Sequence, residues 1–399
     1  MPDKVQQIID CLTGAGYEAY AVGGCVRDVL LGREPEDWDI TTSAKPEQVK
    51  ALFRRTFDTG IKHGTVTVLL GKDGFEVTTY RVDGVYEDGR HPKSVTFTNS
   101  LEEDLKRRDF TINAMAYNPD TGLVDLFHGM RDMENKVICA VGDATERFSE
   151  DALRILRALR FSAQLNYSIE ENTKAAIVQM KENLRQISAE RIRTELQKLL
   201  LSDHPEKLRE LYALGVTSIV LPEYDRMNDA QREDVSTGLG RAKRDPVIRL
   251  SILLLYSDAR AVLKRLKYDN ETIRRVQILV DHADKEIEAT PAQVRKSIVE
   301  TGNDLVPSLL SMKRSIRHQD PSSIDAYERL YQKILNDRDC ISMKDLAVTG
   351  NDLMKELKMK PGRELGDALK KLFEKVLEDP SLNDKEKLIQ LLRDEETFS

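Results

Sequence analysis

Residues 21–42 read AVGGCVRDVLLGREPEDWDITT and combine three signals of one folding unit. An apolar stretch typical of a strand runs into Gly23-Gly24 and is followed by a short helical pattern. A second strand then carries Asp37 and Asp39 on either side of Trp38, the only tryptophan in the chain. Alternate residues of a strand point to the same face, so the two carboxylates are expected side by side. Two such carboxylates repel each other unless a cation lies between them.

The chemistry of this stretch suits a phosphorylated ligand. Two adjacent residues without a Cβ let backbone N–H groups approach an anion, the following helix adds its positive end, and Arg27 in its first turn can touch a phosphate. Paired carboxylates suit Mg²⁺, which is typically held by one or two carboxylates together with substrate phosphates, and such ions assist phosphoryl transfer. Glu76, in the alternating stretch GFEVTTYR (74–81), is a candidate third catalytic carboxylate. The alternative is an ordinary turn and a solvated strand face.

The segment SEDALRILRALRF (149–161) carries a second group of charged residues. Ser149 is expected to cap a helix, on which Asp151, Arg154 and Arg157 recur three residues apart and Arg160 continues the series. A carboxylate only accepts hydrogen bonds and a guanidinium only donates them. An Asp–Arg pair therefore matches the Watson–Crick edges of cytosine and adenine and leaves unpaired groups against uracil and guanine. The alternative is a solvated helix with weak ion pairs.

These side chains make Asp151 and Arg154 candidates for selecting CTP and ATP without a nucleic-acid template, and Arg157 and Arg160 candidates for holding the triphosphate. Arg108, in DLKRRDFTINAMAYN (104–118), is a candidate phosphate or ribose contact. The alternative for Arg108 is a basic turn packed against acidic neighbours.

The composition bounds the class of protein. The chain has 399 residues, enough for two to four domains, with 32% charged and 40% hydrophobic residues. No apolar run reaches the length of a membrane span, the N-terminus does not match a secretory signal, and the four cysteines are far apart, which is typical of reduced cytoplasmic thiols. The net charge of −7 argues against nucleic acid, although a basic stripe on an acidic body can still bind phosphates.

The periodicity predicts an α+β head followed by helices. GTVTVLLG and GFEVTTYRV alternate with period two and predict a hairpin with KDG at its tip. From about residue 149 only helical spacing remains, with breaks predicted near 221–229, 244–250, 288–293 and 320–323.

The chain closely resembles the bacterial class II CCA-adding enzymes, which are tRNA nucleotidyltransferases. The resemblance rests on GGCVRD (23–28), DWDI (37–40), RRDFTINAMA (107–116), LVDLFHGMRDMENKVI (123–138), EDALRILRALRF (150–161) and ERIRTELQKLL (190–200), in the family's order and spacing. It implies that Asp37 and Asp39 bind Mg²⁺. It also implies nucleotide contacts from Gly24, Arg27, Arg108, Asp151, Arg154, Arg157 and Arg160.

The resemblance also implies an architecture. We expect a small nucleotidyltransferase β-sheet head over residues 1–137, followed by an elongated all-α neck over 138–200, a body over 201–300 and a tail over 301–399. The helical parts would hold the tRNA acceptor arm and 3′ end. The stretch 81–97 matches a loop that the family uses to switch from C to A addition; it argues against a CC-only enzyme but does not exclude an A-only one.

Basic clusters in the C-terminal part are candidate contacts for tRNA. One comprises Lys313, Arg314 and Arg317, and the other Lys355, Lys358, Lys360 and Arg363, where a helix is expected to begin. Each is as readily a solvated helix face. His282 lacks neighbouring metal ligands and is interpreted as an ordinary helix residue.

The sequence therefore predicts addition of CCA to tRNA from CTP and ATP, with Mg²⁺, by an enzyme of the cytoplasm. An A-only enzyme or a class II poly(A) polymerase is the nearest alternative, and a non-catalytic RNA-binding protein is the alternative from another class. A homodimer is one quaternary state that the sequence allows.

Overall fold

The computed structural model describes residues 1–84, 95–316 and 320–396. The predicted loop at 81–97 and Arg317 therefore fall wholly or partly outside the described residues. The chain divides into two compact units, the first comprising Met1–Asn228 with Arg265–Lys267 and the second Asp229–Lys264 with Tyr268–Ser399.

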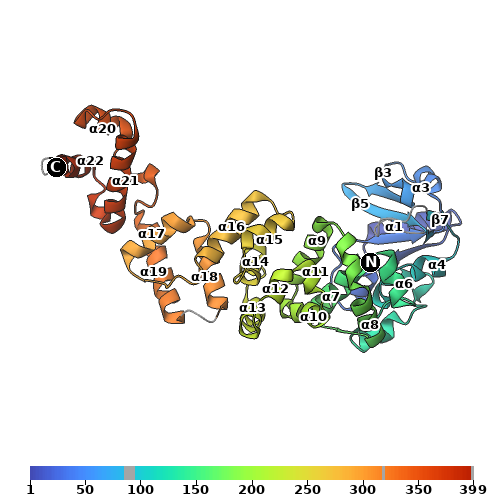
Figure 1. The fold of residues 1–399 in the computed structure, drawn as a ribbon. Helices are drawn as coiled ribbons and strands as arrows, with labels where there is room; N and C mark the ends of the chain where they lie inside the picture. Colours follow the sequence, from blue (N-terminus) through green and yellow to red (C-terminus); the bar gives the residue numbers. More distant parts are fainter. Residues whose placement is uncertain (85–94, 317–319, 397–399) are drawn as a thin grey trace. The chain divides into compact units, whose positions relative to one another are not determined.

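A seven-stranded mixed sheet organises the N-terminal part of the first unit (Figure 1), in the order β3-β4-β5-β2-β1-β8-β9. Strands β2 and β5 run parallel, and the other neighbours in this sheet are antiparallel. The sheet strands are β1 (Ala19–Val22), β2 (Asp39–Thr42), β3 (Thr56–Gly60), β4 (Thr65–Leu70), β5 (Asp73–Thr79), β8 (Ala116–Asn118) and β9 (Gly122–Val124). Two further pairs are β6 (Arg81–Asp83) with β7 (Val95–Phe97) and β10 (Val137–Ile138) with β11 (Ser168–Ile169).

The predicted hairpin is confirmed by β4 and β5, but the prediction of KDG (72–74) at its tip is wrong, because Asp73 and Gly74 already belong to β5. Leu70 pairs with Asp73, so the turn consists of Gly71 and Lys72, and Gly71 has the positive φ of 71° that such a turn requires. Val66, Val68 and Val77 are fully buried, as their period-two spacing predicts. The hairpin thereby fixes the register of β5, which in turn pairs with β2.

Helices cover this sheet and extend the first unit. Helix α1 buries Val5, Ile8, Ile9 and Leu12, which recur at helical spacing. Helix α7 packs on α9, and α6 packs on α8. The helices are α1 (Asp3–Gly14), α2 (Gly24–Leu30), α3 (Pro46–Leu52), α4 (Leu101–Lys106), α5 (Gly129–Glu134), α6 (Ala144–Glu150), α7 (Leu153–Leu165), α8 (Glu171–Met180), α9 (Ala189–Leu200), α10 (Leu208–Ala213), α11 (Thr217–Val220) and α12 (Pro222–Asp225).

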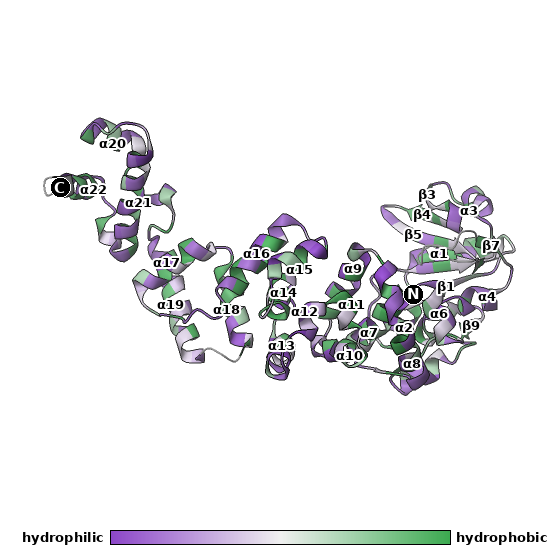
Figure 2. Cartoon of the chain, viewed as in Figure 1, coloured by the Kyte–Doolittle hydropathy of each residue, from purple (hydrophilic) through white to green (hydrophobic). Residues whose placement is uncertain are grey.

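The second unit is helical throughout its described residues. Its helices combine green, apolar stretches with purple, hydrophilic ones (Figure 2), as amphipathic helices do. Three of them begin at a proline directly after a capping side chain, namely Asp245, Thr290 or Asp320. The helices are α13 (Asp229–Arg241), α14 (Pro246–Leu253), α15 (Ala259–Arg265), α16 (Asn270–Asp281), α17 (Pro291–Thr301), α18 (Val306–Ser315), α19 (Pro321–Asp337), α20 (Gly350–Leu357), α21 (Arg363–Glu378) and α22 (Lys385–Glu396).

Buried aliphatic and aromatic side chains join these helices into local cores. Helices α17, α18 and α19 share one cluster that includes Ile298, Leu310 and Tyr331. Helices α20, α21 and α22 share another that includes Leu353, Phe373 and Leu388. The predicted fold class, a mixed α+β head followed by helices, is confirmed. Across the described ranges, no helix is apolar over enough length to span a bilayer.

Candidate active site

Three carboxylates meet at one edge of the central strands. Strand β2 begins at Asp39, and Asp37 lies two residues before it, so the prediction that the strand carries both aspartates is wrong for Asp37. The parallel pairing of β2 with β5 places Glu76 directly opposite Asp39. All three residues are exposed at the surface. The predicted third carboxylate therefore lies beside the predicted pair.

The electrostatics of this edge show mutual repulsion. Partial burial raises the pKa of Asp39, Asp37 raises it further, and the Arg108 guanidinium opposes the rise. Partial burial and then the charges of Asp39 and Asp37 raise the pKa of Glu76. Among the described residues, none donates a hydrogen bond or forms an ion pair to any of these three side chains. A cation would relieve this repulsion.

The donor set suits a divalent ion that also binds substrate. Within residues 1–84, 95–316 and 320–396, no group of three His, Cys, Asp or Glu side chains converges closely enough to hold a metal ion by itself. Two carboxylates with further oxygen ligands from phosphate and water are the usual environment of such an ion in phosphoryl-transfer sites. The residues present therefore fit a metal shared with a nucleotide.

The Gly-Gly turn lies against one of the predicted arginines. Gly23 has φ of 84° and directly precedes α2, and a Cβ there would lie 2.9 Å from Nη1 of Arg108. A side chain at position 23 is therefore disfavoured by the backbone conformation and would also displace the end of Arg108. Gly24 is the first residue of α2, and the space beside it is occupied by the guanidinium of Arg27, 3.6 Å from where its Cβ would be.

Asp104, which was not among the predicted site residues, holds Arg108 near the acidic edge. Its carboxylate is fully buried and accepts hydrogen bonds from Arg107 Nε at 3.0 Å and from Thr41 Oγ1 on β2 at 3.1 Å, and it lies 3.5 Å from Arg108 Nη2. Burial alone would raise the pKa of Asp104, but Arg107 and Arg108 hold it below its usual value. The side chain thus ties the arginines to the strand that begins at Asp39.

The predicted base-reading segment is not one continuous helix. Ser149 lies inside α6, so the prediction that it caps the next helix is wrong. The chain breaks at Asp151, whose carboxylate accepts the backbone N–H of Leu153 at 3.0 Å at the start of α7. The sequence did not predict this break, because the residues on both sides of it have regular helical spacing. Asp151 itself performs the capping expected of Ser149.

Asp151 and Arg154 each have another partner in this structure. Arg191 of α9 donates to Asp151 Oδ2 at 2.7 Å. Arg154 donates to Glu150 Oε2 at 2.6 Å and to the carbonyl oxygen of Arg107 at 2.8 Å. Asp151 and Arg154 therefore lie at the same break but do not pair with each other. Other residues orient Asp151, a hydrogen-bond acceptor, and Arg154, a hydrogen-bond donor.

Three further predicted arginines form a network with buried polar groups. Arg157 Nε donates to Asp109 Oδ2 at 2.7 Å, and Asn113 Nδ2 donates to the other oxygen of Asp109 at 3.0 Å. Arg27 Nη1 donates to the Asn113 side-chain oxygen at 2.6 Å. The charge of Arg157 and the hydrogen bond from Asn113 outweigh burial and hold the pKa of Asp109 well below its usual range.

Arg160 completes the set and is almost fully enclosed. It pairs with Glu195 of α9 at 3.2 Å, and only 6% of its side chain is exposed, compared with 34% for that of Arg157. Sequence reasoning did not identify Asn113, Arg191 or Glu195 as partners, because the ion pairs that it can infer lie within a single helix. A continuous chain of contacts nevertheless links β2, the strand that begins at Asp39, to α7. Asp104 accepts from Thr41 of β2 and from Arg107, and the carbonyl oxygen of Arg107 accepts from Arg154 of α7.

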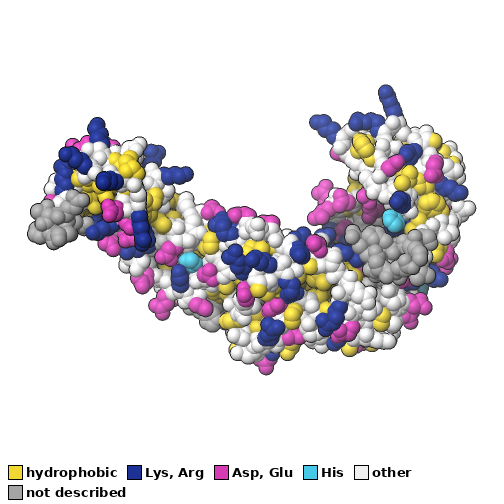
Figure 3. Space-filling model, turned by 45° about the horizontal axis from the view of Figure 1, so that its top comes forward, with side chains coloured by type: hydrophobic (Ala, Val, Ile, Leu, Met, Phe, Trp, Pro, Cys, Tyr) yellow, Lys and Arg dark blue, Asp and Glu magenta, His cyan; other side chains and the backbone are white. Residues whose placement is uncertain are grey.

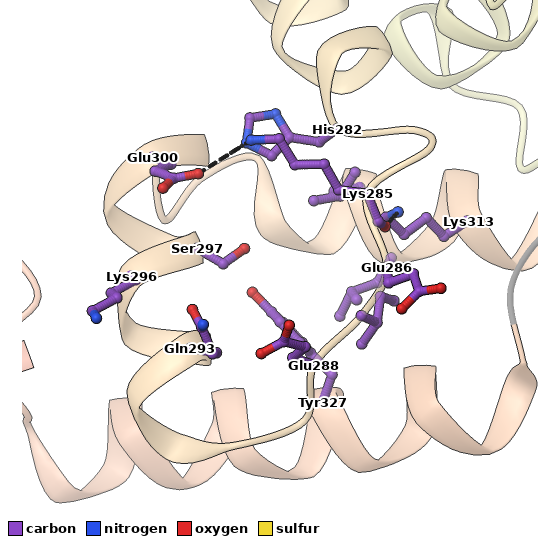
Figure 4. Close-up of a pocket in the computed structure, with 13 residues that line it drawn as sticks. His282, Lys285, Glu286, Glu288, Gln293, Lys296, Ser297, Glu300, Lys313 and Tyr327 are labelled. Carbon is purple, nitrogen blue, oxygen red and sulfur yellow. Dashed lines mark hydrogen bonds and ion pairs between the residues drawn. The ribbon is translucent and has the colours of Figure 1, made fainter. Parts of the chain in front are cut away.

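Lys313 and Arg314, the described members of the first predicted basic cluster, do not form a free cationic face. Lys313 is 2% exposed and donates to the carbonyl oxygens of Ala283 and Lys285, where it lines a cavity of about 150 Å³ (Figure 4). Arg314 pairs with Asp325 and Glu328. His282 lies at the end of α16 beside Glu300, as an ordinary helix residue.

The second basic cluster remains exposed. Lys355, Lys358, Lys360 and Arg363 lie at the surface, and Figure 3 shows Lys and Arg side chains over this C-terminal part of the chain. Helix α21 begins at Arg363, as predicted.

Comparison with known proteins covers most of the chain. Residues 19–139 match the family model described as "Poly A polymerase head domain", residues 166–227 match "Probable RNA and SrmB- binding site of polymerase A", and residues 247–392 match "tRNA nucleotidyltransferase domain 2".

Two relatives of similar length are both CCA-adding enzymes. The CCA-adding enzyme of Leuconostoc mesenteroides is 38% identical, with 96% of this chain and 94% of that protein covered. The CCA-adding enzyme of Streptococcus thermophilus is 37% identical, with 98% and 96% covered. A crystal structure of the Bacillus stearothermophilus CCA-adding enzyme in complex with CTP has 31% identity and a TM-score of 0.85, over 100% of this chain and 99% of that one. The chain described here therefore belongs to the family of CCA-adding enzymes.

Proposed function

We propose that this protein adds the 3′-terminal CCA to tRNA from CTP and ATP, without a nucleic-acid template and with release of pyrophosphate. The observation that supports this best is the chain of contacts from strand β2, which begins at Asp39, through Asp104 and Arg107 to Arg154, three residues after Asp151. Chemistry at a phosphate and selection of a base need these two sets of groups within one unit. The full-length similarity to CCA-adding enzymes supports the same function.

The acidic edge is the proposed site of nucleotidyl transfer. Asp37 and Asp39 would hold a divalent ion, which we propose is Mg²⁺, because carboxylate oxygens and nucleotide phosphates are the ligands it prefers. When bound, the ion supplies Lewis-acid activation and neutralises charge that develops on the phosphate. By holding the ion, Asp37 and Asp39 would allow the α-phosphate to lie beside them, where the tRNA 3′-hydroxyl attacks the α-phosphorus in line and pyrophosphate leaves. Glu76 on β5 would complete the catalytic carboxylate set.

Selection of the base is assigned to Asp151 and Arg154. The carboxylate accepts the amino group that cytosine and adenine share, and the guanidinium donates to the adjacent ring nitrogen. Uracil and guanine present a carbonyl oxygen and a ring N–H at these positions, which leaves both protein groups without a partner. Each mismatched pairing of this kind costs about 1–3 kcal/mol.

The remaining predicted residues would hold the sugar and phosphates. Gly24 allows the backbone to approach the triphosphate closely, and Arg27, Arg108, Arg157 and Arg160 supply positive charge around it. Arg157 is the most exposed of the three arginines that act with α7 and is the one we assign to direct contact.

The helical parts are the proposed binding site for the tRNA acceptor arm. We retain the predicted division into a head (1–137), neck (138–200), body (201–300) and tail (301–399), with Lys355, Lys358, Lys360 and Arg363 as phosphate contacts in the tail. All four cysteines are free thiols, which is consistent with activity in the reducing cytoplasm.

The decisive experiment supplies tRNA lacking its terminal CCA together with CTP alone, ATP alone or both. We expect two nucleotides with CTP and three with both, after which extension stops. A long ladder with ATP would indicate a poly(A) polymerase. A single A added only to tRNA already ending in CC would indicate an A-only enzyme. No incorporation in the presence of bound tRNA would indicate a non-catalytic RNA-binding protein.

A further inference from the structure

Phe161, near the middle of α7, brings three positive charges together around one aromatic ring. The residue is 5% exposed. The guanidinium carbons of Arg160, Arg27 and Arg157 lie 4.2 Å, 5.0 Å and 5.5 Å from its ring centroid. All three distances lie within the range in which a cation is attracted to the negative face of an aromatic ring. Arg27 comes from α2 at the Gly-Gly turn, so the ring also links that turn to α7.

Three guanidinium groups around one ring repel each other, and the structure compensates each of them separately. Arg27 pairs with Asp28 at 2.8 Å, Arg157 with Asp109 at 2.5 Å and Arg160 with Glu195 at 3.2 Å. Each arginine therefore has its own carboxylate in addition to the shared ring. Burial, together with repulsion from Arg157 and Arg27, lowers the pKa of Arg160 to about 10 against the opposing effect of Glu195.

The orientation of the ring is itself fixed. Phe110 meets Phe161 edge-on, with ring centroids 5.8 Å apart and an interplanar angle of 81°. Phe110 is fully buried and belongs to the segment that also contains Asp109 and Asn113. A ring held in this way offers the guanidinium groups a defined surface rather than merely filling volume.

We propose that Phe161 is a positioning residue for the nucleotide triphosphate. Its ring holds Arg27, Arg157 and Arg160 as one array before the nucleotide arrives, so the polyanion meets charges that are already assembled. This inference rests on the proposed function, in which these arginines surround the triphosphate. Arg154, to which base selection is assigned, is oriented by Glu150 and a backbone carbonyl instead. Phe161 therefore acts on CTP and ATP alike and leaves the choice of base unchanged.

The first test replaces Phe161 by leucine in the full chain, with CTP and ATP incorporation into tRNA lacking its CCA as the assay. We expect KM for both nucleotides to rise on the order of tenfold, with little change in kcat and with the preference for CTP over UTP within about twofold of that of the wild type. Phe161→Tyr keeps an aromatic face and should restore most of the loss. An unchanged KM, or an altered preference for CTP over UTP, would overturn the proposal.

The matched control is Phe148→Leu. Phe148 is fully buried in α6, and among the described residues no guanidinium lies over its ring. The same substitution should lower stability there and leave KM unchanged. A rise in KM equal to that of Phe161→Leu would assign the effect to loosened packing and would also overturn the proposal.

A second series separates ring electrostatics from folding. Phenylalanine at position 161 is replaced by its mono-, di- and trifluorinated analogues, which keep the shape of the ring and progressively weaken its attraction for cations. We expect the logarithm of KM to rise steadily with fluorination, and a flat series would contradict the inference. Failure of the proposed function is distinguishable, because the wild-type protein would then not add CCA in the same assay.

Discussion

At the acidic edge, the charge of Asp37 disfavours ionisation of Asp39, and the charges of Asp39 and Asp37 disfavour ionisation of Glu76; Arg108 opposes this effect at Asp39, but no described side chain forms an ion pair with any of the three. Around α7 the situation is the reverse. All five predicted arginines already pair with a carboxylate: Arg27 with Asp28, Arg108 with Asp104, Arg154 with Glu150, Arg157 with Asp109 and Arg160 with Glu195.

This difference shows which of the two regions needs a ligand to compensate its charges. Neighbouring carboxylates without an ion-pair partner repel each other until a bound cation neutralises them. The acidic edge therefore lowers the stability of the metal-free protein but favours metal binding. Buried arginines with carboxylate partners are stable without a ligand, and removal of one partner leaves an uncompensated charge. The two regions should therefore respond in opposite ways to the same chemical change.

The largest effect is expected from Asp39→Asn. Loss of one carboxylate should reduce nucleotide incorporation by about 10³-fold or more, since metal stabilisation of a transition state is worth several kcal/mol. Binding of tRNA should persist, and the free energy of unfolding should not fall, because the substitution removes repulsion. Incorporation kinetics and denaturant unfolding measure the two quantities.

The control for this prediction is Asp73→Asn on the same strand as Glu76. In the part of the chain that the structure describes, the Asp73 side chain forms only an exposed ion pair with Lys4 and should tolerate the change. Full-rate turnover by the Asp39 variant would contradict the assignment of the metal site.

Asp109→Asn applies the same change to the paired region and should have the opposite effect on stability. Asp109 is 7% exposed and neutralises Arg157. We expect the free energy of unfolding to fall by about 3 kcal/mol, because Arg157 is left without its counter-charge. Because the folded-state pKa of Asp109 lies below its unfolded value, its contribution is present above the unfolded pKa and is lost as the pH falls through the folded pKa.

Chemical denaturation at pH 7 and at progressively lower pH tests this prediction. The difference in stability between the wild type and the variant should shrink under acidic conditions. Equal stability of the two proteins at pH 7 would show that the network around α7 is not held together by this carboxylate.

A smaller effect is expected on base selection. Asp151→Asn replaces a pure acceptor by an amide that both donates and accepts, so uracil gains a partner. The preference for CTP over UTP should fall by a factor of about 10 to 100, which competition between the two nucleotides measures. Asp143→Asn, at the exposed start of α6, keeps its capping function and should leave the preference unchanged. A preserved preference in the Asp151 variant would locate base selection elsewhere.

The sequence predicted secondary-structure elements and candidate site residues more reliably than the neighbours that contact those residues. The hairpin of β4 and β5, the start of α21 at Arg363 and the breaks before Pro246, Pro291 and Pro321 all follow from local rules of alternation, capping and proline. The placement of Glu76 beside Asp39 follows from strand pairing, which the sequence could only suggest.

The partners depend on contacts that no local pattern records. Arg191 approaches Asp151 from 40 positions away, and Arg27 meets Asn113 from 86 positions away. Burial is equally hidden, since Lys313 stands in a charged stretch and was expected at the surface. Charge in a sequence identifies a group that needs compensation, but only the fold determines which neighbour compensates it.

Lys313, in the second unit, differs from both the acidic edge and the arginines around α7. It is a buried cation that has no carboxylate within ion-pair distance among the described residues. Its ammonium group donates to two carbonyl oxygens, and burial lowers its pKa to about 8. Between pH 8 and the pKa of lysine in the unfolded chain, near 10.4, the unfolded chain binds more protons than the folded one, so stability rises with pH.

We expect the free energy of unfolding of the wild type, relative to Lys313→Met, to increase by about 2 kcal/mol from pH 8 to pH 10. Denaturant unfolding of both proteins across that range measures the difference. A difference that does not change with pH would mean that Lys313 stays protonated in the folded protein and that the carbonyl oxygens compensate its charge as fully as carboxylates compensate the arginines of α7.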